Sequence, residues 1–183
     1  MQYELNTPCT AADLAPLKAG DTVLLSGVVY TARDQAHKRM LEALDRGEKL
    51  PFDLEGSAIY YVGPTPERPG EVIGSAGPTT SGRMDAMSPR LLDLGNKIMI
   101  GKGKRDAAVK EAVVRNGAVY LAALGGAGAL MAQSVQTLEV IAWPDLGCEA
   151  VRRLTVQDMP LTVILDAHGG DLYLEGPEAY RNR

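Results

Sequence analysis

The chain has 183 residues, a formal net charge of −4 and 45% hydrophobic residues, which is the composition of a globular protein with a core of its own. This length predicts one domain, residues 1–183, and the negative charge argues against nucleic acid as the main partner. No stretch of about 18 apolar residues occurs, and residues 1–5 lack the basic and apolar regions of a signal peptide. We therefore expect no membrane association and a cytoplasmic location.

The two cysteines, Cys9 and Cys148, lie far apart and form no C-x-x-C pair. We interpret them as reduced thiols. Two cysteines cannot hold an iron–sulfur cluster alone, because such a cluster takes about four protein ligands, or three where one iron is open.

The order of apolar and polar stretches predicts an α/β fold. Residues 22–30 predict a buried strand that is interrupted at Gly27, followed by a helix from about 32 to 46. Thr31 and Asp34 have the spacing of a capping box at the start of that helix. The other expected elements are a helical turn at 10–14, strands at 57–62, 71–76, 98–100, 118–122, 135–143 and 160–165, helices at 85–94, 105–115 and 127–133, a proline-rich loop at 63–70, and a polar tail at 175–183.

Residues 77–85 (GPTTSGRMD) have the composition of a binding loop rather than of a core segment. Arg83 is preceded by two glycines, a proline and three hydroxyl side chains. Apolar segments flank the whole stretch on both sides. Hydroxyls, backbone N–H groups and one arginine are groups that bind an anion. We therefore expect this loop to lie outside the core and to face an anionic ligand.

Two further cations lie at predicted element ends. Arg33 lies in the first turn of the helix at 32–46, where the helix dipole disfavours a cation, so it is either an exposed arginine or shares an anion with the helix N-terminus. Lys102 follows the strand at 98–100 and lies between two glycines. Open α/β sheets bind ligands at such strand ends, although a surface lysine in a turn is the alternative.

The glycine-rich stretches do not match nucleotide-binding motifs. The Walker pattern places four residues between its first glycine and Gly-Lys, then requires serine or threonine, and the sequence around Lys102 meets neither condition. Residues 125–128 depart from G-x-G-x-x-G, and no acidic residue follows at the required distance. These mismatches argue against a nucleotide ligand.

Each of the two histidines has a structural and a chemical interpretation. His168 follows Asp166 at a strand end, so the two could form an acid–base pair, or His168 could be a turn residue bonded to its neighbours. His37 lies in the helix at 32–46, where a partly buried structural histidine is the simpler interpretation. A metal site from two histidines so far apart in sequence has little support.

Three motifs that occur in order are similar to those of a known family: residues 31–37 (TARDQAH), 77–85 and 100–104 (IGKGK). Together they resemble the β subunit, or C-terminal domain, of the iron–sulfur class I fumarate hydratases and L(+)-tartrate dehydratases. The glycines near 125 and residues 143–147 (WPDLG) fit the same family, so that the resemblance covers roughly residues 5–175. It implies a swivelling β/β/α domain.

The resemblance also implies a partner, a cofactor and a site. A larger α subunit would hold a [4Fe–4S] cluster on three cysteines, with one iron open to a small dicarboxylate substrate, in a dimer of αβ pairs. Arg33, Arg83 and Lys102 correspond to the cationic substrate contacts of the family, and Thr79 corresponds to its proposed catalytic base. Lys104 departs from the pattern, because many relatives have asparagine there.

Threonine is a poor base when free, so Thr79 would need help from the site, such as a carboxylate of the partner. The alternative for Thr79 is a hydroxyl that caps the loop or the next helix. The resemblance favours the β subunit of a hydro-lyase that reversibly hydrates fumarate to (S)-malate, and Gly82 and Asp85 fit that branch better than the tartrate branch. Two alternatives stay open: an L(+)-tartrate dehydratase β subunit that gives oxaloacetate, and a non-catalytic binding domain of the same fold.

Overall fold

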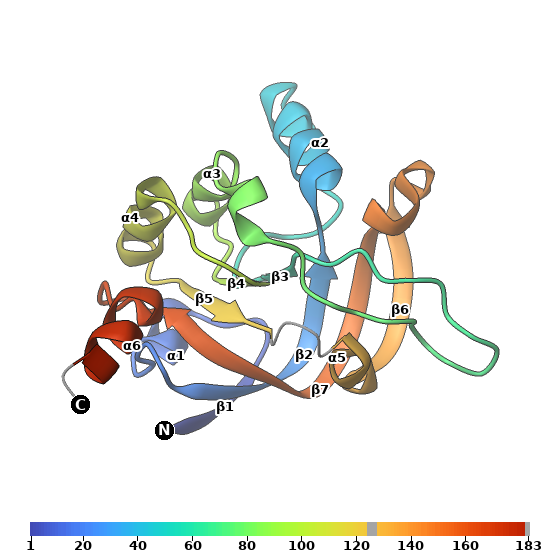
Figure 1. The fold of residues 1–183 in the computed structure, drawn as a ribbon. Coiled ribbons are helices and arrows are strands. Elements are labelled where there is room, and N and C mark those ends of the chain that lie inside the picture. Colours follow the sequence, from blue (N-terminus) through green and yellow to red (C-terminus); the bar gives the residue numbers. More distant parts are fainter. Residues whose placement is uncertain (124–127, 182–183) are drawn as a thin grey trace.

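The computed structural model describes residues 1–123 and 128–181 of the chain. Its centre is a closed barrel in which β2, β3, β4 and β5 run parallel, and β7 completes the ring antiparallel to both β5 and β2 (Figure 1). These strands are β2 Thr22–Thr31, β3 Ala58–Tyr60, β4 Ile98–Gly101, β5 Val119–Ala122 and β7 Val151–Leu165. β1 (Gln2–Asn6) pairs with β2, and β6 (Val135–Ala142) pairs with β7. The predicted α/β class is confirmed.

Helices α2, α3 and α4 lie along one side of the barrel, with α5 and α6 elsewhere on its surface (Figure 1). The α-helices are α1 Ala11–Leu14, α2 Asp34–Asp45, α3 Ser88–Asp93, α4 Ala107–Arg115, α5 Gly128–Gln133 and α6 Leu172–Arg181. Two 3-10 helices are η1 Ser81–Met84 and η2 Pro144–Glu149. Within the described ranges, every helix is too short or too polar to cross a bilayer.

The central strands bury side chains on both faces. On β4, Ile98 and Ile100 join the cluster that fills the barrel, whereas Met99 between them packs against the helices on the outside. On β5, Leu121 points into the barrel and Tyr120 points outward. Side chains alternate between the two faces of a strand, so strands that are buried on both faces read as continuous apolar runs. This explains why the sequence pattern predicted these strands.

Three predicted elements differ from those in the structure. The strand expected at 160–165 begins at Val151. Its first part pairs with both β2 and β6, and this part was missed because polar side chains interrupt its buried ones. No strand forms at 71–76, where the backbone of Ser75 instead bonds Thr65 across the loop. The helix expected at 85–94 is α3 alone, preceded by η1.

The two ends of the described chain also differ from prediction. β1 was not expected, because its side chains alternate between exposed and half-buried positions at the edge of the sheet. The polar tail at 175–183 was expected to follow the last element, yet α6 extends to Arg181. The Asp171 carboxylate starts that helix by accepting the Tyr173 N–H at 2.9 Å. Residue 127, the expected start of the helix at 127–133, lies outside the described residues.

Candidate functional site

The carboxyl ends of three neighbouring parallel strands lead to the expected site residues. Arg33 comes two positions after the end of β2, and Lys102 comes directly after β4. Between them, β3 leads into Tyr61, whose carbonyl oxygen accepts the Thr79 N–H at 2.7 Å. Loops that follow adjacent parallel strands meet at one edge of the sheet, and this edge carries Arg33 and Lys102 just after β2 and β4, with Thr79 bonded to Tyr61 just after β3.

The loop at 77–85 is fixed directly onto the end of β4. Ser81 donates its N–H to the Lys102 carbonyl oxygen at 2.8 Å, and Ser81 Oγ accepts the Lys102 N–H at 3.1 Å. A Cβ at Gly101 would collide with the Ser81 side chain, so glycine is required there for this close approach. The expectation that the whole loop lies outside the core is wrong, because Ser81 and Met84 are fully buried while Arg83 is exposed.

The buried side chain of Arg105 anchors the loop at 77–85 through hydrogen bonds. The Arg105 side chain is 0% exposed, and its Nε donates to Asp85 Oδ1 at 2.6 Å while Nη2 donates to Ser88 Oγ at 2.8 Å. Its guanidinium carbon lies 5.3 Å and 4.9 Å from the ring centroids of Tyr61 and Tyr120. A buried charge needs such pairing and hydrogen bonding to be tolerated. The network therefore joins the 77–85 loop to the segment after Lys102.

One carboxylate lies between the two candidate arginines. Arg83 Nε donates to Asp34 Oδ1 at 2.7 Å, and the other oxygen of Asp34 lies 3.7 Å from Arg33 Nε. Those last two atoms are both buried and make no hydrogen bond with the described residues. The Arg83 side chain is 51% exposed, so a ligand can reach it. The capping box predicted for Thr31 and Asp34 is wrong, because Thr31 belongs to β2 and Asp34 bonds Arg83 instead.

Arg33 is half-buried rather than exposed, and the carboxylate that it shares with the N-terminus of α2 is Glu149 of the same chain, so the predicted binding of a ligand anion there stays a prediction. Glu149 Oε1 lies 3.3 Å from Arg33 Nη2, and Glu149 Oε2 accepts the Gln35 N–H in the first turn of α2 at 2.8 Å. Arg33 is the N-cap residue of α2, and its side chain makes no capping hydrogen bond. Glu149 supplies the cap from far along the sequence.

His37 is completely buried rather than partly buried. Its Nδ1 lies 3.0 Å from the Arg33 carbonyl oxygen, its ring meets Tyr61 edge-on, and its Nε2 has no hydrogen-bond partner among the described residues. Burial lowers the pKa of His37 to about 4, with the nearby Arg105 charge acting in the same direction. His37 is therefore neutral at pH 7, and it fixes the backbone of Arg33.

His168 has the structural role. Its ring Nε2 lies 2.7 Å from the Ala15 carbonyl oxygen, and its N–H bonds Asp166 Oδ1 at 2.9 Å. The Asp166 carboxylate also accepts the N–H groups of Ala19 and Gly170. Burial acts to raise the pKa of Asp166, but these backbone hydrogen bonds together outweigh it and lower that pKa. The Asp166 side chain thus organises a turn and does not face the His168 ring as an acid–base partner.

The side chains of Thr79 and Lys102 make few contacts. The Thr79 hydroxyl makes no hydrogen bond within residues 1–123 and 128–181, so the capping role considered as its alternative is not seen there. Lys102 is exposed, and its ammonium group pairs with no carboxylate in the same ranges. The exposed Lys102 is therefore accessible to a ligand at this edge, whereas Thr79 is half-buried.

The described residues contain no group of three histidine, cysteine, aspartate or glutamate side chains that could hold a metal ion. Cys9 is buried, which raises the pKa of its thiol to about 11, and Cys148 is exposed. A cluster that needs three or four thiolates does not fit these residues.

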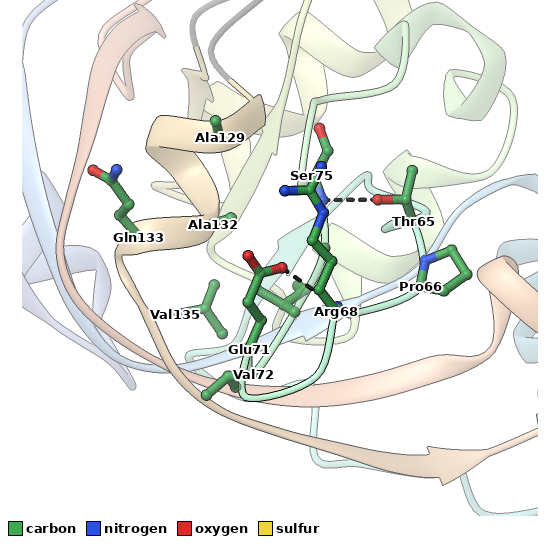
Figure 2. Close-up of a pocket in the computed structure, with 12 residues that line it drawn as sticks. Thr65, Pro66, Arg68, Glu71, Val72, Ser75, Ala129, Ala132, Gln133 and Val135 are labelled. Carbon is green, nitrogen blue, oxygen red and sulfur yellow. Dashed lines mark hydrogen bonds between the residues drawn. The ribbon is translucent and has the colours of Figure 1, made fainter.

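Two hollows of the described surface are lined by residues other than the four candidate site residues. One of about 480 Å³ lies between the loop at 65–75 and the α5–β6 segment (Figure 2). Another, of about 390 Å³, lies between α4 and the turn after β7. Neither is lined by Arg33, Thr79, Arg83 or Lys102. The candidate site is thus an exposed edge rather than either of these hollows.

Sequence reasoning missed Asp34, Glu149 and Arg105 as parts of this arrangement. Asp34 was interpreted as a capping residue, and Arg105 as the ordinary start of a helix. Glu149 lies 114 positions from Gln35, so only the pairing of β7 with β2 brings it near α2. The available signal was an acidic residue two positions after the WPDLG motif.

The fold and the site define an α/β barrel domain with a cationic edge at the ends of its parallel strands. The chain belongs to the fumarase C-terminus family, whose model matches residues 1–176. It is 42% identical over 181 residues to a putative L(+)-tartrate dehydratase subunit beta of Methanocaldococcus jannaschii, covering 96% of this chain and 92% of that protein.

Two further relatives come from Escherichia coli. The aerobic class I fumarate hydratase is 36% identical over 177 residues, which cover 94% of this chain and 32% of the relative. The L(+)-tartrate dehydratase subunit beta is 33% identical over 188 residues, covering 100% of this chain and 92% of the relative. The chain thus spans about a third of the class I fumarate hydratases that it matches and nearly all of the β subunits.

Proposed function

We propose that this chain is the β subunit of a two-subunit class I hydro-lyase that reversibly hydrates fumarate to (S)-malate. The observation that supports this proposal is the edge at which Arg33, Arg83, Lys102 and Thr79 come together on neighbouring strand ends and one loop. In this proposal residues 1–183 form one swivelling β/β/α domain. It works in a cytoplasmic complex that is a dimer of αβ pairs.

The substrate class follows from the charges. A four-carbon dicarboxylate carries two carboxylates one short molecule apart, and the planar fork of an arginine binds a carboxylate through two parallel N–H groups. Arg83 is held through Nε by Asp34, which orients the rest of its guanidinium, and Lys102 adds a movable positive charge. In this proposal Arg33, Arg83 and Lys102 bind and orient the two carboxylates.

Thr79 is the proposed proton-transfer residue. In the dehydration direction a proton leaves the carbon next to the one that carries the hydroxyl, the electron pair of that C–H bond forms the double bond, and the C–O bond breaks so that the hydroxyl leaves as hydroxide. Thr79 would take that proton at Oγ1 while a carboxylate of the α subunit takes the hydroxyl proton of Thr79, because a free threonine is a poor base. The proposed α subunit also holds the [4Fe–4S] cluster, which when bound supplies a Lewis acid for the hydroxyl group.

The test compares each site residue with a matched neighbour in the chain reconstituted with its cluster-bearing partner. Arg83→Ala is paired with Arg90→Ala, since Arg90 is a similarly exposed arginine that pairs with Asp45 instead. Lys102→Ala is paired with Lys104→Ala, and Thr79→Val with Thr80→Val. We expect each site variant to lose about a hundredfold or more in kcat/KM, and each control to stay near the parent.

Equal rates for site and control variants would favour a non-catalytic binding domain of the same fold. The isolated chain is expected to be colourless and inactive. A brown preparation with an iron–sulfur absorbance band and full activity without a partner would contradict the subunit assignment.

L(+)-tartrate dehydratase is the second candidate, with oxaloacetate as its product. The lengths of the relatives favour it. The two relatives described above that are nearly as long as this chain are an L(+)-tartrate dehydratase subunit beta and a putative one, and the chain covers 92% of each. Steady-state rates of the reconstituted complex on fumarate, malate and L(+)-tartrate separate the two. A kcat/KM for tartrate above that for malate and fumarate would replace the first assignment.

A further inference from the structure

The connection between β6 and β7, residues 143–150, packs onto α2. Arg39 on α2 donates to both carboxylate oxygens of Asp145, at 3.0 Å and 2.5 Å, and its guanidinium carbon lies 6.0 Å from the Trp143 ring centroid. At the base of the connection, Arg152 donates to the carbonyl oxygens of Gly147, Cys148 and Ala150 at 2.9–3.0 Å. These contacts fix the path of the connection beside the helix.

Glu149 is the residue of this connection that reaches the site. Its side chain is 15% exposed, and its two oxygens have separate tasks: Oε2 caps α2 at Gln35, and Oε1 pairs with Arg33 Nη2 at 3.3 Å. Asp34 lies on the Nε side of the same guanidinium, at 3.7 Å. Two carboxylates therefore hold Arg33 from two sides before any ligand arrives.

We propose that Glu149 is a positioning residue for Arg33. An arginine side chain has several rotatable bonds, and ordering it at the moment of binding costs affinity that a pre-ordered side chain retains. A guanidinium that is misplaced by about 1 Å can lose about two orders of magnitude in rate. Glu149 acts through Arg33 and needs no contact with the substrate, so the inference rests on the proposed role of Arg33 in dicarboxylate binding.

Glu149→Gln is the informative variant in the reconstituted complex. The amide oxygen can still accept the Gln35 N–H, while the negative charge beside Arg33 is lost. We expect kcat/KM for the dicarboxylate to fall about tenfold. Asp145→Asn is the matched control, because it weakens the same connection at Arg39 without touching Arg33, and it should stay within about twofold.

A double-mutant cycle with Arg33→Ala separates positioning from general stability. Glu149→Gln should cost nothing further when Arg33 is already absent. An equal loss in both backgrounds, or no loss in the parent, would overturn the inference. If Arg33→Ala alone leaves the rate unchanged, the proposed function fails instead, and the two failures are thus distinguishable.

A spectroscopic measurement tests the positioning without any turnover. In a ¹⁵N–¹H spectrum of the full chain, the Nε–H signal of Arg33, assigned through Arg33→Lys, should be sharp and dispersed in the parent. It should move toward the random-coil position in Glu149→Gln and remain in place in Asp145→Asn. An Arg33 signal that is indifferent to Glu149→Gln would refute the positioning role even if the complex were inactive.

Discussion

Arg105→Met is expected to destabilise the chain far more than the loss of any exposed ion pair. The Arg105 side chain is 0% exposed, and methionine is a flexible apolar replacement that fills much of the same space. What disappears is the charge, two hydrogen bonds to Asp85 and Ser88, and the stacking on two tyrosine rings. Asp85 is then left as a buried carboxylate without its cation.

The expected magnitude follows from that unpaired carboxylate. Breaking one side of a buried ion pair costs about 3–5 kcal/mol, whereas an exposed pair contributes about 0–1 kcal/mol. Arg115 provides the matched control, because it pairs with Asp93 at 2.9 Å but is 49% exposed. We therefore expect Arg105→Met to lower the free energy of unfolding by about 3–5 kcal/mol, and Arg115→Met to leave the urea midpoint close to that of the parent.

Urea unfolding followed by circular dichroism measures both variants, with midpoints compared at equal slope. The added substitution Asp85→Asn should recover part of the loss, because it removes the unpaired charge and keeps an oxygen for the Asp106 N–H. The reasoning is refuted if the two arginine variants unfold within about 1 kcal/mol of each other, or if Asp85→Asn makes Arg105→Met worse.

Three further predictions concern single groups. The pKa of His37 lies at about 4 in the folded chain against 6.5 as its ordinary value, so the unfolded chain binds the extra proton. Stability should therefore fall by up to about 3 kcal/mol as the pH drops from about 6.5 to 4, and a flat urea midpoint between pH 7 and pH 5 would contradict this. Exposed Cys148 should react with a thiol reagent at pH 8 within minutes while buried Cys9 stays unmodified, and two equally fast thiols would be inconsistent with the fold. Gly101→Ala should cost about 1–3 kcal/mol through its collision with Ser81, whereas Gly82→Ala, whose Cβ would meet nothing closer than 3.7 Å, should be nearly neutral by thermal unfolding.

Strands that are buried on both faces were the most predictable part of this fold. β4 and β5 are short apolar runs bounded by glycine or polar residues. Because both faces of each strand are buried, the whole run is apolar and predicts a buried strand. Lys102 was placed correctly for the same reason, since the end of β4 was clear in the sequence. The first half of β7 could not be predicted from an apolar run, because two arginines and other polar residues lie between its buried residues.

Local patterns failed where a tertiary contact was stronger. Thr31 and Asp34 have the spacing of a capping box, but the Thr31 hydroxyl is buried at the end of β2 and bonds the backbone of Ala150 and Arg152. The strand pairing that brings these residues together is set by contacts about 120 positions apart. A real capping box occurs at Thr10 and Asp13, where both residues are exposed and no such pairing competes.

The charges at the strand ends explain why this edge is better suited to be half of a site than a whole one. Arg33, Arg83 and Lys102 carry three positive charges, and Asp34 and Glu149 neutralise two of them within the chain. One net positive charge remains against the two negative charges that a dicarboxylate brings. The internal carboxylates orient the guanidinium groups but weaken their attraction for a ligand. Under the proposed function, tight dicarboxylate binding at this edge would therefore need further cationic side chains or hydrogen-bond donors from the α subunit.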